Sequence, residues 1–166
     1  VKDEWTLAPV AFLAATLLAI SLIDLEHYIV PNRIVAPALG ASLLLYAGAL
    51  GGPAEPTDLV RAVTAGLVAG LGLGVVHLVS PGGMGMGDVK LAFLLGLHLG
   101  WAGWGQVGLG FFLGFAYGSV VGVGLLITGR RGRREHIPFA PFLAGGTMTA
   151  LLWGAPIIDW YRGAGS

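Results

Sequence analysis

The sequence predicts an all-α membrane protein, a polytopic bundle of about six transmembrane helices. Three observations lead to this fold class. Of the 166 residues, 55% are hydrophobic and only 11% are charged, whereas soluble domains carry about 25% charged residues. The chain also contains 29 glycines. Its apolar runs, finally, approach the length of about 20 residues that crosses a bilayer as a helix. A soluble globular domain is therefore excluded.

Six apolar runs are the candidate spanning helices. In chain order, they are Leu7–Ile23, Ile34–Leu50, Leu59–Val79, Val89–Trp104, Val107–Thr128 and Phe139–Ile158. Proline and glycine mark the breaks, because proline cannot donate a backbone hydrogen bond and glycine tolerates positive φ. These breaks are at Pro31, Pro53–Pro56, Pro81–Gly83, Gly105 and Gly129–Glu135.

The fourth run is the shortest, and we expect it to be the least regular. No connection is long enough to hold a soluble domain, so we interpret residues 1–166 as a single transmembrane domain. Glycines in the third and fifth runs are interpreted as packing positions, since small residues let helix backbones approach closely in lipid. They are Gly66, Gly70, Gly72, Gly74, Gly110, Gly114 and Gly118.

The charged residues predict how the chain sits in the membrane. Nine basic and nine acidic residues cancel, so no net field favours nucleic acid as a partner, and the expected surroundings are membrane lipid. Basic residues favour cytoplasmic loops. The arginine cluster consists of Arg130, Arg131, Arg133 and Arg134. If this cluster is cytoplasmic, six alternating spans place both chain ends outside, and they place Arg33 and Lys90 inside with the cluster. Six of the nine basic residues are then inside. The cluster could bind anionic headgroups, although a topology anchor is the simpler interpretation.

Cysteine is absent from the sequence. This excludes disulfides, thiolate zinc sites, iron–sulfur clusters and cysteine nucleophiles together. We expect no metal and no cofactor.

Two acidic residues stand at the edges of apolar runs. Asp24 follows the first run, and Asp88 precedes the fourth run, after a glycine-rich segment. A lone carboxylate at membrane-boundary depth is costly unless it is paired or hydrated. The topology places both residues on the cytoplasmic side, so the fold can bring them together.

A pair of carboxylates at one site has a specific chemistry. Both cannot ionise cheaply, so one keeps a proton near neutral pH. An aspartyl protease needs this state: the ionised group takes a proton from water, and the protonated group donates to the scissile carbonyl. A helix start favours the ionised form of Asp88. Placement alone leaves two alternatives open, a proton- or ion-coupled transporter using the same aspartates and a structural role.

The residues before Asp88 favour the aspartyl protease over the transporter and the structural role. In Gly85-Met86-Gly87-Asp88, two glycines would let the backbone approach a peptide substrate closely, and we expect the helix to begin only after Asp88. A glycine-rich loop can also cradle phosphate. That reading is poor here, because no strand precedes the loop and an acid occupies the helix start.

Three separated motifs resemble those of the type IV prepilin leader peptidases, membrane aspartyl proteases of the GxGD type. The first is Asp24 followed seven residues later by Pro31 and then Asn32, the second is Gly85–Asp88, and the third is Ile-Pro-Phe-Ala-Pro-Phe-Leu at 137–143. A GxGD alone recurs by chance in a glycine-rich chain. Three motifs in the right order, at span ends across nearly the whole chain, are specific.

The resemblance implies an aspartic endopeptidase whose catalytic pair is Asp24 and Asp88. Gly85 and Gly87 would shape the loop that carries Asp88. Lys90 would hold this loop near headgroups, contact substrate, or simply extend to the interface as a snorkelling lysine. The implied partner is a prepilin or pseudopilin with a basic leader and a hydrophobic stem helix. It would be cut at the cytoplasmic face of the bacterial inner membrane.

Two departures from the family pattern stand out. Many members carry an N-terminal portion with paired CxxC motifs, associated with methylating the new N-terminus, and a chain without cysteine has no such motif. We therefore expect no methyltransferase activity, and either a short peptidase-only form or a missing part supplied elsewhere. Ala140 stands where the family usually has glycine, which concerns local packing only.

Histidines and aromatic residues receive simpler interpretations. His77 and His98 lie in or near spans and are expected to be hydrogen-bonded core or boundary residues, while His27 could neighbour the site through Asp24. Tyrosines and tryptophans near the outer ends, including Tyr46 and Trp101, are expected to form an interfacial belt.

Overall fold

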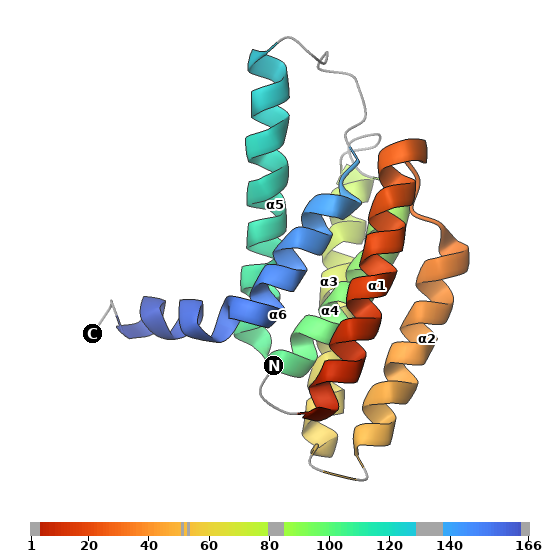
Figure 1. The fold of residues 1–166 in the computed structure, drawn as a ribbon, viewed down its shortest axis with the longest axis vertical. Helices are drawn as coiled ribbons and strands as arrows, with labels where there is room; N and C mark the ends of the chain where they lie inside the picture. The colour runs from red at the N-terminus through yellow and green to blue at the C-terminus, as the bar shows by residue number, and fades with distance from the viewer. Residues whose placement is uncertain (1–3, 51, 53, 80–84, 129–137, 164–166) are drawn as a thin grey trace.

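The computed structural model describes residues 4–50, 52, 54–79, 85–128 and 138–163. These residues form six α-helices and no strand, which confirms the predicted fold class (Figure 1). The helices are α1 (Glu4–His27), α2 (Asn32–Ala49), α3 (Pro56–Val79), α4 (Met86–Ala102), α5 (Trp104–Ile127) and α6 (Ala140–Gly163). The arginine cluster, the break at 81–83 and residue 137 of the third motif lie outside the described residues.

Four of the described helices are long and apolar enough to cross a membrane: α1, α3, α5 and α6. The six predicted helices therefore all form, but α2 and α4 do not meet this criterion in the described part of the chain. α4 has 17 residues, or about 25 Å at 1.5 Å per residue, and the hydrocarbon layer is about 30 Å thick.

α4 is central to the bundle. It packs against α2, α3, α5 and α6, and most of its residues between Asp88 and Gly100 are buried. The expectation that the fourth run is the least regular is wrong, because α4 is one continuous helix. Its regularity follows from its surroundings, since a helix enclosed by other helices must satisfy its backbone groups internally.

Glycine allows the closest helix contacts, as predicted. Gly66 and Gly70 of α3 face α4, and Gly96 and Gly100 of α4 face α3; a Cβ at Gly96 would lie 2.7 Å from the carbonyl oxygen of Ala65. Residues four apart share one helix face, so each pair forms a flat strip on its helix. Gly72 is an exception to the prediction, because a Cβ there would meet nothing within 4 Å.

α5 and α6 make a second close contact of this kind. A Cβ at Gly146 of α6 would meet backbone atoms of Gly110 and Gly114 in α5. These contacts leave the two carboxylate-bearing segments at one end of the bundle, where α1 ends and α2, α4 and α6 begin (Figure 1). We call this the aspartate end. The opposite end, where α2 and α4 finish and α3 and α5 start, is called the far end.

Candidate active site

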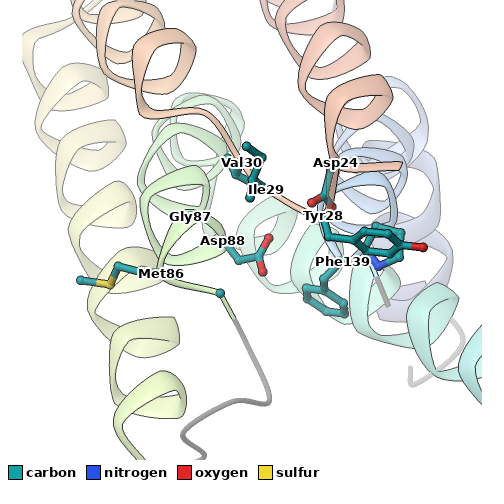
Figure 2. Close-up of a pocket in the computed structure, with 10 residues that line it drawn as sticks. Asp24, Tyr28, Ile29, Val30, Met86, Gly87, Asp88 and Phe139 are labelled. Carbon is teal, nitrogen blue, oxygen red and sulfur yellow. The ribbon is translucent and has the colours of Figure 1, made fainter. Parts of the chain in front are cut away.

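A pocket of about 200 Å³ lies at the aspartate end. Its walls come from the end of α1, the α1–α2 connection, the start of α4 and the residues just before α6. Asp24 and Asp88 both line it, so the structure brings together the two carboxylates that the sequence singles out (Figure 2). The other lining residues are Tyr28, Ile29, Val30, Gly85, Met86, Gly87, Pro138 and Phe139.

Asp24 lies inside α1, which continues to His27 rather than ending at residue 23. Its side chain is buried, and its Oδ2 accepts the backbone N–H of Ala140 at 3.1 Å. Ala140 is the first residue of α6, where N–H groups have no partner within their own helix. Asp24 therefore caps α6 from another helix, and its Oδ2 is fixed while it faces the pocket.

Asp88 is the third residue of α4, in its first turn. The expectation that the helix starts only after Asp88 is thus wrong: α4 begins at Met86, and the N–H of Asp88 donates to the carbonyl of Gly85 at 3.1 Å. The side chain is buried. A negative group is favoured in the first turn of a helix, where N–H groups point outward. Figure 2 shows its carboxylate directed into the pocket, on the side of Asp24 and Phe139.

The two motif glycines differ in what they do. A Cβ at Gly87 would lie 2.6 Å from the Cβ of Val30 and 3.1 Å from its carbonyl oxygen. A side chain at Gly87 would therefore push apart two walls of the pocket. Gly85 precedes α4 with extended backbone, and a Cβ there would make only an ordinary 3.5 Å contact with Oδ2 of Asp88. Close approach explains glycine at position 87 but not at 85.

Lys90 does not line the pocket that holds the aspartates. Its Nζ instead donates to Oδ1 of Asn32, 3.0 Å away, at the first residue of α2. This bond joins the start of α2 to the start of α4. The roles expected for Lys90 stay predictions.

Tyr28 is a pocket residue that sequence reasoning missed. It follows α1 with φ of 56°, and no other non-glycine residue in the described ranges has a positive φ. A left-handed residue often ends a helix, but glycine usually fills that position. The N–H of Tyr28 donates to the carbonyl of Asp24 at 2.9 Å, and Tyr28 lines the pocket together with Phe139. A tyrosine in the sequence does not predict a positive φ, so this conformation could not be foreseen.

His27, which the sequence places near the site, is not among the pocket-lining residues. It is exposed, and its Nδ1 lies 3.8 Å from Oε2 of Glu26. Neighbourhood along the chain does not place it at the carboxylates, because successive residues of a helix point in different directions.

Comparison with known proteins identifies the family of this chain. The sequence profile of the Type IV leader peptidase family matches residues 11–127, a range that includes Asp24 and Asp88. A Bacillus subtilis protein is 32% identical over 93% of this chain and 59% of its own length. Relatives from Aeromonas salmonicida and Pseudomonas putida are 33% and 36% identical, covering 95% and 86% of this chain and 53% and 48% of their own lengths.

Each of these relatives is named prepilin leader peptidase/N-methyltransferase. This chain spans about half the length of the curated relatives that it matches. No solved structure matches it. The chain belongs to the Type IV leader peptidase family, and its apolar helices make it a bacterial integral membrane protein.

Proposed function

We propose that this chain is an aspartic endopeptidase that removes the leader peptide of a prepilin or pseudopilin. One observation carries the proposal: Asp24 and Asp88, remote in the sequence, line the same pocket. Membership of the leader peptidase family supports it, and so do the names of the relatives. The transporter alternative gains nothing from these comparisons, although it would use the same two residues.

In the proposed reaction, Asp88 acts as general base and Asp24 as general acid. The first turn of α4 favours the anionic form of Asp88, and Asp88 takes a proton from a water that attacks the scissile carbonyl carbon. Oδ2 of Asp24 is occupied by the N–H of Ala140, which leaves Oδ1 to carry the proton that is donated to the carbonyl oxygen. Collapse of the tetrahedral intermediate breaks the C–N bond: Asp88 gives the proton that it took from water to the leaving amine, and a hydroxyl of the intermediate returns a proton to Asp24 as the new carboxyl group forms.

The pocket also suits a peptide whose two halves differ in polarity. A basic leader would stay in water beyond the aspartate end, and the hydrophobic stem helix would lie laterally among the spans. Hydrolysis needs water that the hydrocarbon layer does not supply, and both carboxylates lie at an end of the bundle rather than at its centre (Figure 1). Met86, Ile29 and Phe139 give the pocket apolar walls for the residues that flank the scissile bond.

The test is cleavage of a prepilin-like substrate by the purified chain in nanodiscs. Asp24→Asn and Asp88→Asn should each abolish processing while membrane insertion and helix content stay unchanged. Asp159→Asn makes the same chemical change at an exposed position of α6 and should leave processing intact. Processing by either of the first two variants would reject the catalytic pair.

We further propose that the aspartate end faces the cytoplasm. The described basic residues divide evenly, with Arg33 and Lys90 at the starts of α2 and α4 and Arg61 and Arg162 at the start of α3 and the end of α6. The proposal therefore rests on the sequence, in which four more arginines, Arg130, Arg131, Arg133 and Arg134, stand between α5 and α6. Because the chain has no cysteine, single cysteines can be labelled cleanly in bacterial cells. A membrane-impermeant maleimide should label Thr57→Cys and spare Glu26→Cys; the opposite pattern would reverse the orientation.

A further inference from the structure

A second pocket, of about 290 Å³, lies between α2 and α4. Asn32, Val35, Ala36 and Leu39 of α2 line it, with Lys90 and Phe93 of α4. Lys90 is two residues after Asp88, which is about 200° around the helix. The pocket is therefore on the side of α4 turned away from the aspartates. We call it the Lys90 groove.

The groove changes from polar to apolar along its depth. At its mouth, Nζ of Lys90 donates to Oδ1 of Asn32 at 3.0 Å. The deeper lining consists of Val35, Leu39 and Phe93. Leu39 is seven residues after Asn32, which corresponds to about 10 Å along the axis of α2. A ligand that fits must have a polar head and an apolar body.

Among the described residues that line the groove, one is a cation, Lys90, and none is a carboxylate. Among the described residues, the ion pairs are His27 with Glu26 and Arg61 with Asp58. An ammonium group has three donors, and the amide oxygen of Asn32 takes one from Lys90. Arg33 is an exposed cation one turn before Ala36 on α2 and lies next to the groove in sequence rather than among the residues that line it. These cations favour an anionic group at the mouth.

We propose that the Lys90 groove binds one anionic phospholipid. Its phosphate would lie between Lys90 and Arg33, and one acyl chain would lie against Val35, Leu39 and Phe93. Basic pockets between helices at a membrane surface recognise acidic headgroups in this way. A free phosphate would leave the apolar part of the groove unfilled.

The size of the groove favours an acyl chain over a helix. A helix with its side chains is about 10 Å wide, whereas the groove of about 290 Å³ lies between two helices that are themselves in contact. A hydrophobic substrate helix could insert only single side chains there. An acyl chain is narrower and needs no backbone hydrogen-bond partners, so it can fill the space between α2 and α4.

The position of this site gives it a structural consequence. Asn32 is two residues after Val30, which makes the close contact with Gly87. A lipid bound across Lys90 and Arg33 would hold the starts of α2 and α4 together behind the aspartate pocket. The binding itself does not depend on what the aspartates do.

Native mass spectrometry of the purified full chain tests the proposal. The chain is incubated with equal amounts of phosphatidylglycerol and phosphatidylcholine that carry the same acyl chains. We expect phosphatidylglycerol to be retained preferentially. This preference should fall about fivefold in Lys90→Gln, and about fivefold further when Arg33→Gln is added to it. Lys90→Arg should keep it. Arg162→Gln, an exposed charge change near the end of α6, should also keep it.

A second variant separates the acyl chain from the headgroup. Ala36→Phe fills the groove from an exposed position without changing its charge, and it should lower retention of both lipids. Excess inorganic phosphate should not displace the lipid. Thermal unfolding in detergent shows whether each variant is folded.

Three results would overturn the proposal. They are equal retention of the two lipids by the unaltered chain, an undiminished preference in the Lys90→Gln, Arg33→Gln double variant, and displacement of lipid by inorganic phosphate or by a hydrophobic helical peptide. None of these bears on cleavage, so the lipid site and the proposed peptidase stand or fall separately.

Discussion

The two ends of α4 place buried polar side chains in different settings. At the far end, His98 is 1% exposed, and both of its ring nitrogens are hydrogen-bonded to side chains of α2. At the aspartate end, Asp88 is also buried. Each of the two residues lines a pocket, of about 400 Å³ for His98 and about 200 Å³ for Asp88, and the pocket of Asp88 is shared with the carboxylate of Asp24. The same helix thus uses one polar residue to hold α2 in place and sets another beside a second acid. The comparison teaches that burial alone does not distinguish structure from chemistry.

The far-end network determines the form of its histidine. Ser42 Oγ donates to the carbonyl of Ala38 at 2.8 Å, so it accepts from Nε2 of His98 at 2.9 Å. Nδ1 then accepts from the hydroxyl of Tyr46 at 2.7 Å. This assignment gives a neutral ring with both nitrogens occupied. The core role expected for His98 fits, whereas the interfacial place expected for Tyr46 is wrong, since Tyr46 is 2% exposed.

Arg61 completes the far end. Its guanidinium donates to the carbonyls of Gly100 and Trp101 at 2.8 and 2.7 Å and to Oδ1 of Asp58 at 2.8 Å. The last carbonyls of α4 have no partner inside the helix, so this arginine caps α4 from α3. Asp58 is held in this contact, and its side chain is 30% exposed.

Asp88→Asn should have the largest effect on function and a small one on folding. Cleavage of a prepilin-like substrate should fall about 1,000-fold or more, because the amide cannot take a proton from water. The free energy of unfolding should change by less than about 1 kcal/mol, the usual value for one charge at a helix end. Progress curves for cleavage and denaturant titration of the same sample measure both. A large loss of stability would show that Asp88, like His98, has a structural role in the bundle.

His98→Leu should show the reverse pattern. It leaves the buried hydroxyls of Tyr46 and Ser42 without their partner, which costs about 3 kcal/mol in the free energy of unfolding. Denaturant titration in detergent measures this loss. Adding Tyr46→Phe should recover part of it, because one unpaired hydroxyl is removed. If His98→Leu is as stable as the unaltered chain, the far-end network is not a structural element.

Gly87→Ala tests the contact that separates the pocket walls. A Cβ there would lie 2.6 Å from the Cβ of Val30, and overpacking of this kind costs about 2 kcal/mol. We expect lower stability together with at least tenfold slower cleavage. Gly85→Ala is the matched control, since its Cβ makes only an ordinary contact. Equal effects at the two positions would show that the loop adjusts freely.

Tyr28→Gly should have the smallest effect, and in the opposite direction. Glycine adopts positive φ without the steric cost of a Cβ, so the free energy of unfolding should rise by about 1 kcal/mol. Tyr28→Ala keeps the Cβ and loses the ring, so it should not be stabilised. Thermal unfolding of the two variants gives the comparison. A less stable glycine variant would show that the packing of the ring outweighs the backbone strain.

Much of the fold could be predicted from the apolar runs, and the helix ends could not. The first and fourth runs were bounded at Asp24 and Asp88, yet both residues are helical. A carboxylate ends the hydrophobic pattern without ending the backbone hydrogen bonds, particularly in a first turn where it is favoured. α2 forms where its apolar run predicts a helix, with 18 residues, but it is not among the four described helices that are long and apolar enough to span a membrane.

The candidate site divides in the same way. The sequence motifs single out Asp24, Asp88 and Gly87, and the structure places all three around one pocket. The cap that Asp24 provides for Ala140 and the bond from Lys90 to Asn32 join segments far apart in the chain. Such contacts depend on how the helices pack, which a local pattern does not encode. The catalytic roles remain predictions.

The contact between Gly87 and Val30 determines how closely two walls of the aspartate pocket approach each other. Main chain and Cβ atoms form this contact, and these atoms cannot move by changing a rotamer. Lining side chains such as Met86 and Phe139, and the two carboxyl groups, can still turn. Side-chain motion can therefore reshape the cavity without altering this contact, whereas a single methyl group added at position 87 would press on it directly.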